Sequence, residues 1–407
     1  MNMLVKKICL IISICLYIIN LFCPVYSFIN KDVLSVYDGI PKIYLVGNID
    51  DMNDKKDERK VSINYISDGI SFAKFAKIKI QGSSSLRYEK KNYTIKLYND
   101  ENLEDSFKVD FGWGKENKYV LKANWIDKTH SRNIVSSNLV SMASNKYGLF
   151  DEGPNNGNID GYPVEVYING HFLGLYTLNI PKDAWMLGLD EENENHLLFE
   201  AEYNGKVNYF RKKANYDSWS LQVGEENSSN LDKLNRLVDF IRNSNDKEFK
   251  NNFSKYFNLD SVLNYYVFVD ALYLEDNIAK NMLLVTYDGK VWYPLLYDLD
   301  TSFGSNPYGN ELYKYNGSVS FKKSLLFERF GKLFKEEIKD RYFELREEVL
   351  SIENIYNSID SFSMKISSSS LEKENDRWSN IPGYDLFQMK SFVGARLLYL
   401  DEVYSEK

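Results

Sequence analysis

The sequence predicts an α+β fold in which a strand-rich N-terminal half precedes a helix-rich C-terminal half. Before residue 180, several short segments alternate apolar and polar residues with a period of two, which is typical of strands. After Pro181, apolar residues recur at helical spacing over longer segments. The chain has 407 residues, a length at which one core usually divides in two, so we expect the functional site in a cleft between two lobes.

The first half contains five strand patterns and one helix. Asn169-Gly170 lies between the last two patterns and predicts a tight hairpin, because such a turn needs positive φ at both central residues. Residues 129–144 carry apolar side chains at helical spacing, with Asp127 or Thr129 as the expected cap. The strands are expected at residues 77–80, 92–97, 119–123, 164–168 and 173–178.

The second half is expected to contain mostly helices, with a few short strands among them. Its boundary with the first half lies near residues 179–182, which predicts a strand-rich, nucleotide-binding lobe at residues 28–180 and a lobe with the catalytic hairpin and helices at residues 181–407. The helices are expected at residues 231–242, 248–257, 259–274, 321–350, 352–365 and 384–404, and the strands at residues 197–199, 282–287 and 291–297.

Residues 1–27 have the pattern of a secretory signal peptide. Lys6-Lys7 precede an apolar run at residues 8–23, and Val25 and Ser27 are the small residues before a cleavage site. We expect cleavage after Ser27, secretion to the cell or spore surface, and no stable membrane span in the mature chain; an uncleaved anchor helix is the alternative. The three cysteines all lie in this segment, so the mature chain can form no disulfide of its own.

Charge and missing motifs exclude several classes of function. Loss of Lys6 and Lys7 changes the formal charge from −8 to −10, so the mature protein has no basic field that would attract nucleic acid. No HExxH, P-loop or GxGxxG motif occurs. The only histidines, His130, His171 and His196, are scattered along the sequence, which argues against a histidine-rich metal cluster.

The most informative pattern is a group of acids and an asparagine around one predicted hairpin. Asp276 and Asn281 follow a long apolar helix and reproduce the D-x-x-x-x-N spacing of the protein-kinase catalytic loop. Asp298 ends the second strand of the hairpin, and Asp300 lies two residues further on. These oxygen ligands suit Mg²⁺. A solvated loop with turn-forming Asp and Asn residues is the alternative.

A Gly/Ser loop between two predicted strands is a candidate phosphate site. Small residues let backbone N–H groups and hydroxyls approach an anion, and neighbouring lysines supply positive charge. An ordinary polar hairpin is the alternative. The small residues are Gly82, Ser83, Ser84 and Ser85, and the candidate lysines are Lys90, Lys91 and Lys96.

Together these patterns resemble the spore coat protein H (CotH-like) kinase family, which has an atypical protein-kinase fold. The resemblance implies a two-lobed, protein-kinase-like structure with a mainly β N-lobe that contains one helix and a mainly α C-lobe. It covers about residues 77–304. Four blocks in the family's order carry it: residues 81–85 with 90–93, residues 124–133, residues 164–176, and residues 276–281 with 298–300.

The resemblance implies roles for the acidic hairpin. Asp276 resembles the catalytic-loop Asp, Asn281 the metal-binding loop Asn, and Asp298 the metal-binding Asp, with Asp300 as a candidate second ligand. Tyr297 stands where the family often has Trp, a departure that affects packing.

The remaining candidates would bind ATP. The family's basic block falls on Lys90-Lys91, and Lys96 on the following strand is an equal candidate for the nucleotide lysine. Arg132 matches a family position on the helix, and Glu165 is a further candidate for the helix Glu of ordinary kinases. Glu89 stands where Pro is frequent, a departure that affects the loop.

We therefore expect an exported kinase that uses ATP with Mg²⁺ or Mn²⁺ to phosphorylate Ser or Thr on a protein, and the resemblance implies spore coat or surface proteins as substrates. ATP is scarce outside cells, so a non-catalytic surface or spore-coat binding protein on a kinase-like scaffold is the alternative. The joint presence of Asp276, Asn281 and Asp298 favours the enzyme. A glycosyltransferase that used residues 298–300 as a D-x-D motif would need alternating strands and helices before it, which this sequence does not predict.

Overall fold

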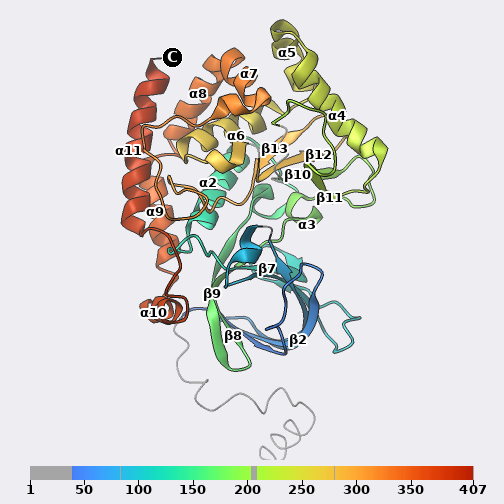
Figure 1. Ribbon diagram of the computed structural model, residues 1–407, viewed down its shortest axis with the longest axis vertical. Helices are drawn as coiled ribbons and strands as arrows, with labels where there is room; N and C mark the ends of the chain where they lie inside the picture. Colours follow the sequence, from blue (N-terminus) through green and yellow to red (C-terminus); the bar gives the residue numbers. More distant parts are fainter. Residues whose placement is uncertain (1–38, 83, 203–208, 279, 407) are drawn as a thin grey trace, which may run out of the picture.

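The computed structural model describes residues 39–82, 84–202, 209–278 and 280–406. It confirms the α+β class: a β-barrel forms the N-terminal half, and most of the chain towards the C-terminus is helical (Figure 1). The expected signal peptide at residues 1–27 lies outside the described residues. Within the described part, no helix has the length and apolar character needed to cross a membrane.

Seven strands close the barrel in the order β1-β2-β3-β4-β7-β9-β8, with a parallel β1–β8 pair and antiparallel pairs elsewhere. The strand patterns at residues 77–178 were predicted correctly, whereas β1 and β2 were not predicted. The strands are β1 (Lys42–Val46), β2 (Glu58–Ile66), β3 (Ser71–Gln81), β4 (Asn92–Tyr98), β7 (Lys118–Lys122), β8 (Gly161–Ile168) and β9 (His171–Asn179), and a separate pair is formed by β5 (Val109–Asp110) and β6 (Lys115–Glu116).

Alternation of side chains builds the barrel core. In β3, Ile78 and Ile80 are buried, while Lys77 and Lys79 alternate with them and carry their charges outward. The predicted hairpin between β8 and β9 is confirmed, because Asn169 and Gly170 both have positive φ, 50° and 83°. One face of β3 therefore fills the barrel, and the other faces outward.

A second core lies in the helical half, around α6, in which every residue from Ser261 to Ala271 is buried. A four-stranded sheet of order β11-β10-β12-β13 packs beside the helices. The elements are α3 (Ala184–Leu187), β10 (Leu197–Ala201), β11 (Trp219–Val223), α4 (Ser228–Asn243), α5 (Asp246–Asn252), α6 (Leu259–Ala271), β12 (Met282–Thr286), β13 (Tyr293–Leu296), α7 (Leu325–Leu333), α8 (Lys335–Arg346), α9 (Ile352–Ser363), α10 (Ser368–Arg377) and α11 (Leu386–Ser405).

The structure differs from the expected helices in several places: α3 was not predicted, and the helix expected at residues 248–257 ends as α5 at Asn252. The single helix predicted at residues 321–350 is wrong: it is divided into α7 and α8 at Phe334, which leaves the helical conformation and packs its ring 4.9 Å from that of Phe253. Helix α10 was not predicted, because its sequence is largely polar, and it lies against β9 of the barrel (Figure 1).

Helix α2 (Arg132–Lys146) is the helix predicted within the strand-rich half. The N-cap residue is Ser131, not Asp127 or Thr129 as expected, and its side chain makes no cap hydrogen bond. Asp127 nevertheless accepts the backbone N–H of Arg132, the first helical residue, at 2.8 Å. The apolar side chains of α2 join the core of the helical half and not the core of the barrel. Helix α2 thus connects the segment that follows β7 to the helical half.

Candidate functional site

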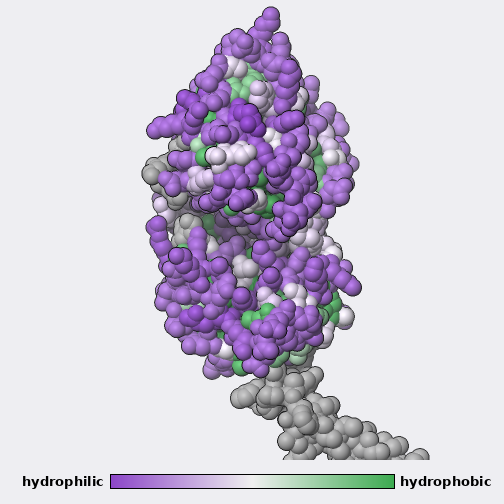
Figure 2. All heavy atoms as spheres, turned by 90° about the vertical axis from the view of Figure 1, so that its right-hand side faces the viewer, coloured by the Kyte–Doolittle hydropathy of each residue, from purple (hydrophilic) through white to green (hydrophobic). Residues whose placement is uncertain are grey.

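A cleft with a volume of about 1040 Å³ lies between the barrel and the helical half. The space-filling view shows a mostly hydrophilic surface that narrows at the waist between the two halves (Figure 2). Strands β3, β4 and β7 line the cleft from the barrel, and the loops that follow α6 and β13 line it from the helical half. These loops contain the acidic hairpin identified in the sequence.

The loop after α6 begins with a single 3₁₀ turn, η6 (Glu275–Ile278), which brings Asp276 to the cleft. The Asp276 Oδ2 atom accepts the Asn281 side-chain amide at 3.3 Å and lies 3.2 Å from Lys280 Nζ. Asn281 has a left-handed φ of 57°, and its carbonyl accepts the backbone N–H of Tyr297 at 3.1 Å. The two ends of the predicted catalytic hairpin are therefore joined directly.

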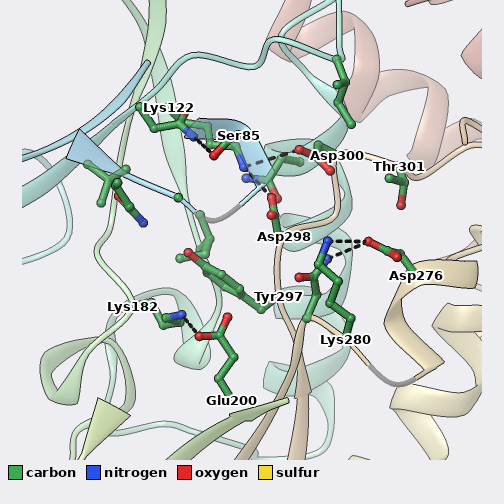
Figure 3. Close-up of a pocket in the computed structure, with 18 of the residues that line it drawn as sticks. Ser85, Lys122, Lys182, Glu200, Asp276, Lys280, Tyr297, Asp298, Asp300 and Thr301 are labelled. Carbon is green, nitrogen blue, oxygen red and sulfur yellow. Dashed lines mark hydrogen bonds and ion pairs between the residues drawn. The ribbon is translucent and has the colours of Figure 1, made fainter. Parts of the chain in front are cut away.

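The loop after β13 turns sharply at Asp298, whose φ is 54°. The next backbone N–H, from Leu299, donates to Asn133 Oδ1 of α2 at 2.9 Å. This bond fixes the segment between Asp298 and Asp300, so both carboxylates face the cleft (Figure 3).

Lys122, at the end of β7, faces these two acids from the barrel (Figure 3). Its Nζ atom lies 2.5 Å from Asp298 Oδ1 and 3.5 Å from Asp300 Oδ2. Burial alone would lower the pKa of Lys122, but the charges of Asp298 and Asp300 outweigh it and raise that pKa. Burial likewise opposes ionisation of Asp298, yet Lys122 holds the pKa of this carboxyl below its ordinary value.

Asp300 differs from Asp298 in that its pKa is raised and not lowered. Its burial, followed by the charge of Asp298, raises the pKa of Asp300 to about 7, and Lys122 only partly offsets this effect. Two neighbouring carboxylates that share one lysine form a site where a further cation would be favourable.

A second ion pair lies at another part of the cleft. Lys182 pairs with Glu200 of β10, and the Lys182 Nζ atom lies 4.7 Å from the centre of the Tyr297 ring (Figure 3). Burial raises the pKa of Glu200, although Lys182 opposes this shift. The cleft is also lined by apolar side chains, among them Ile80, Val120 and Ile180.

The Gly/Ser loop is only partly at the cleft. Ser85 lines it, and its Oγ atom accepts the Asn92 side-chain amide at 3.2 Å. Ser84 begins the 3₁₀ turn η3 (Ser84–Arg87), and Ser83 lies outside the described residues.

The three candidate lysines are engaged elsewhere or face outward. Lys90 borders the cleft, but its ammonium is buried against Glu374 of α10 at 2.5 Å. The Lys91 Nζ atom donates to the carbonyls of Leu86 and Tyr88. Lys96 is exposed on β4 and does not line the cleft.

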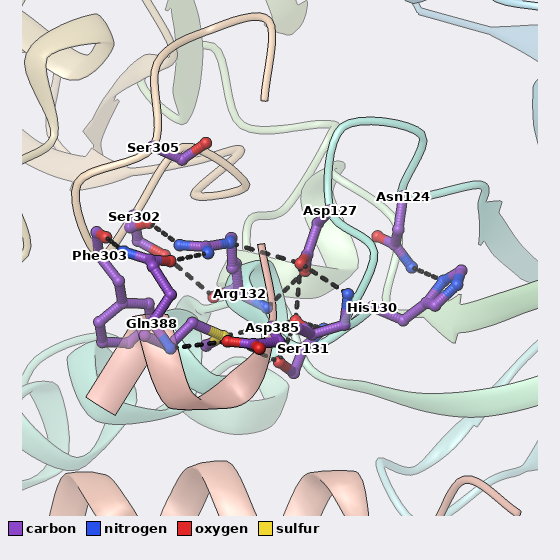
Figure 4. A network of polar contacts seen from close by, with 12 residues as sticks. Asn124, Asp127, His130, Ser131, Arg132, Ser302, Phe303, Ser305, Asp385 and Gln388 are labelled. Atoms are coloured by element: carbon purple, nitrogen blue, oxygen red, sulfur yellow. Dashed lines mark hydrogen bonds and ion pairs between the residues drawn. The ribbon is translucent and has the colours of Figure 1, made fainter. Parts of the chain in front are cut away.

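Arg132 and Glu165 are both buried away from the cleft lining. The Arg132 guanidinium lies 3.4 Å from Asp127 and donates to the Ser302 carbonyl and to Gln388, which ties α2 to the segment after Asp300 and to α11 (Figure 4). The carboxylate of Glu165 on β8 contacts Ser370 and Lys373 of α10. Both residues join elements of the fold, and neither reaches the acids of the cleft.

Sequence reasoning missed Lys122 and gave no role to Lys182, Glu200 or Lys280. The strand predicted at residues 119–123 did carry a signal: Tyr119 and Leu121 are the buried face, so Lys122 lies on the opposite face with Val120. Its acidic partners come from residues far along the chain, which a local pattern cannot reveal.

The donor set at the cleft suits a hard cation bound together with phosphate. In the part of the chain that the structure describes, no group of three or more His, Cys, Asp or Glu side chains is placed to hold a metal ion. Asp298, Asp300 and Asn281 offer two carboxylates and one amide oxygen, and Mg²⁺ is commonly held by one or two carboxylates with substrate phosphates and water. These residues therefore fit Mg²⁺ better than a zinc-like centre.

The family model of the CotH kinase protein matches residues 78–400, which is more than half of the chain. The chain belongs to this family. The match spans the Gly/Ser loop, Lys122, Asp276 and both cleft acids that follow β13. No curated protein matches the sequence. Membership of the CotH kinase family implies a kinase-like fold and kinase activity, and it therefore implies use of ATP.

One feature of this CotH kinase differs from ordinary protein kinases. In those enzymes the nucleotide lysine pairs with a Glu of the helix that follows its strand. Helix α2 follows β7 here and contains no acidic residue. Lys122 instead pairs with Asp298 and Asp300 across the cleft.

Proposed function

We propose that this CotH-family protein is an exported atypical kinase that transfers the γ-phosphate of ATP to a Ser or Thr hydroxyl of a protein, with Mg²⁺ or Mn²⁺. The observation that carries the proposal is the meeting of Asp276, Asp298 and Asp300 with Lys122 in one cleft between the barrel and the helices. Such a set supplies a base, oxygen ligands for a metal and a cation for phosphate.

The cleft offers different surroundings for the two ends of ATP. Apolar side chains from β3, β7 and the segment after β9, including Ile80, Val120 and Ile180, suit the flat base. Ser85 and Lys122 lie beside the acids and suit the phosphates. In the complex, Lys122 would exchange part of its contact with Asp298 and Asp300 for phosphate oxygens.

Asp298, Asp300 and Asn281 would hold the metal ion. When bound, it supplies positive charge that neutralises the phosphates during transfer. Burial, followed by the charge of Asp298, raises the pKa of Asp300, so this pair of carboxylates would be stabilised by a bound cation.

Asp276 would accept or orient the proton of the attacking hydroxyl. A bond forms between the acceptor oxygen and the γ-phosphorus, the bond from that phosphorus to the ADP oxygen breaks, and the hydroxyl proton passes to Asp276. Lys280 forms an ion pair with Asp276 at 3.2 Å and would help to hold this carboxylate in place.

The substrate and the site of action are inferred from the family resemblance and from the first 27 residues. We propose spore coat or other surface proteins as substrates, and secretion by way of the signal peptide. Because ATP is scarce outside cells, the enzyme would act in a compartment where ATP persists.

The test is incubation of protein that begins at Phe28 with γ-labelled ATP, Mg²⁺ or Mn²⁺, and a generic protein acceptor. Transfer of label to Ser or Thr, or autophosphorylation, is the expected result. Absence of transfer with both metals would refute the kinase proposal and favour a binding protein on a kinase-like scaffold.

A further inference from the structure

The backbone next to Lys122 is held by buried polar side chains. Ala123, the following residue, is bound at both of its backbone polar groups. Its carbonyl accepts Lys90 Nζ at 2.9 Å, and its N–H donates to Asn92 Oδ1 at 2.7 Å. The carbonyl of Lys122 itself accepts the Asn124 side-chain amide at 3.3 Å. The position of Lys122 thus depends on side chains outside its own strand.

Lys90 is held in turn by a helix from the far end of the chain. Its Nζ atom lies 2.5 Å from Glu374 Oε1 of α10, and it also donates to the Leu175 carbonyl at 2.5 Å. The second carboxylate oxygen of Glu374 accepts the Leu175 N–H at 2.6 Å. With the bond to Ala123, all three donors of the ammonium have partners.

This ion pair is almost completely removed from water, with side-chain exposures of 0% for Lys90 and 4% for Glu374. The Tyr176 ring covers Lys90 at 4.5 Å, and His130 Nε2 lies 3.8 Å from Glu374. Burial, together with the charge of Lys90, lowers the pKa of His130 well below its ordinary value, so His130 is neutral. A buried ion pair adds little net stability to a fold. We therefore look for the role of the Lys90–Glu374 pair in how it positions the neighbouring backbone.

We propose that Glu374 is a positioning residue of this kinase, which acts through Lys90 and Ala123 to hold Lys122 in place for the phosphates of ATP. The inference rests on the proposed function. Helix α2 has no Glu that could pair with Lys122. The Glu374 carboxylate of α10 would take over this positioning role, because it orders the backbone beside Lys122 without pairing with Lys122 itself.

Removal of the charge on Glu374 has a predictable consequence. The buried Lys90 ammonium loses its counter-ion, so it either gives up a proton or turns towards the cleft. In both cases its bond to the Ala123 carbonyl weakens and Lys122 becomes less well placed. ATP affinity should fall, whereas the affinity for a protein acceptor, which does not depend on Lys122, should stay.

Glu165 provides a matched control at the same interface. It is also a completely buried glutamate between the barrel and α10, and it accepts from Ser370 at 2.8 Å and Lys373 at 2.9 Å. It lies on β8 and no contact with Lys90 or Ala123 is seen within the described chain. Glu165→Gln therefore weakens the docking of α10 without touching the support of Lys122.

The test compares Glu374→Gln, Glu165→Gln and the parent at a temperature at which all three are folded. We expect Glu374→Gln to raise the KM for ATP by about tenfold or more, with the acceptor KM unchanged, and Glu165→Gln to leave both constants at the parental value. A parental KM for ATP in Glu374→Gln would overturn the inference. So would an equal rise in Glu165→Gln, since docking of α10 would then explain the effect.

A double variant separates positioning from folding. Lys90→Met with Glu374→Met removes both buried charges, so no unpaired charge remains. The Ala123 and Leu175 backbone groups lose their partners and the Tm should fall, so ATP affinity is measured at a temperature at which this variant is folded. ATP affinity should remain low, and its full recovery would contradict the proposal. Calorimetric ATP affinities separate the kinase proposal from the positioning role of Glu374. If the parent binds ATP but transfers no phosphate, only the kinase reaction is refuted. If the parent binds no ATP, the kinase reaction and the positioning role are both refuted.

Discussion

Lys122 of the barrel and Asp298 of the helical half form an ion pair across the cleft, with 2.5 Å between Nζ and Oδ1. These two side chains come from opposite walls of the cleft, so the ion pair links the barrel to the helical half. Asp300, at 3.5 Å from the same nitrogen, shares the lysine and is left with a raised pKa. A nucleotide with a metal ion would supply the missing positive charge and compete for Lys122.

Replacing Lys122 should weaken ATP binding. We expect Lys122→Met to reduce ATP affinity by about ten- to a hundredfold, because a hydrogen bond between charged groups contributes about 1.5–3 kcal/mol. Titration calorimetry measures the change. Lys96→Met is the control, since Lys96 is exposed on the barrel and does not line the cleft. Equal ATP affinities for Lys122→Met and the parent would show that the phosphates lie elsewhere.

Asp298 should govern the response to metal. In the parent, ATP together with Mg²⁺ or Mn²⁺ should raise the Tm more than ATP alone. Asp298→Ala should abolish this additional rise, because the site loses a carboxylate ligand, while the variant still unfolds cooperatively. An undiminished metal-dependent rise in Asp298→Ala would exclude this residue as the chief ligand.

The metal-free protein should lose stability as the pH rises towards neutrality. The pKa of Asp300 is about 7 in the folded chain against 3.8 ordinarily, so between these values the folded state holds a proton that the unfolded state has released. The free energy of unfolding therefore falls over this range, by at most about 4 kcal/mol from this group. Asp300→Asn should remove the contribution.

The measurement is the Tm of the parent and of Asp300→Asn at several pH values from about 4 to 8, in the presence of a chelator. Relative to the variant, the parent should become steadily less stable up to about pH 7 and then change little. The same pH dependence in both proteins would mean that Asp300 does not titrate in this range.

The mature protein should begin at Phe28. Val25 and Ser27 provide the small residues that signal peptidase requires, and the apolar run before them is short for a membrane span. Mass spectrometry of the exported protein gives the answer. A chain that begins at Met1 in the exported fraction would favour the uncleaved anchor.

Much of the fold was predictable because its signals are local. The strands that end at Gln81, Tyr98 and Lys122 have period-two patterns, and the turn at Asn169-Gly170 needs only two residues to be recognised. Helix α10 escaped prediction because the contacts that hold it, such as that of Glu374 with Lys90, join residues far apart in the sequence.

In the candidate site, too, only the residues with a local sequence signal could be predicted. Asp276, Asn281, Asp298 and Asp300 are spaced along one hairpin, and the structure brings all four to the cleft. Spacing could not select the lysine that faces the cleft acids, since several lysines on neighbouring strands fit a basic block equally well. Lys122 lies at the end of β7 that meets Asp298, whereas Lys96 pairs with Lys118 at the other end of that strand and does not line the cleft.

Steady-state phosphate transfer by Asp276→Asn tests the central claim most directly. This substitution keeps the size and one acceptor oxygen of the side chain but removes the charge, so ATP and metal affinities should stay close to those of the parent. The kcat should fall by about a hundredfold or more, the usual contribution of a general base. Transfer at the parental rate by Asp276→Asn would contradict the catalytic role of this residue and of the hairpin that presents it.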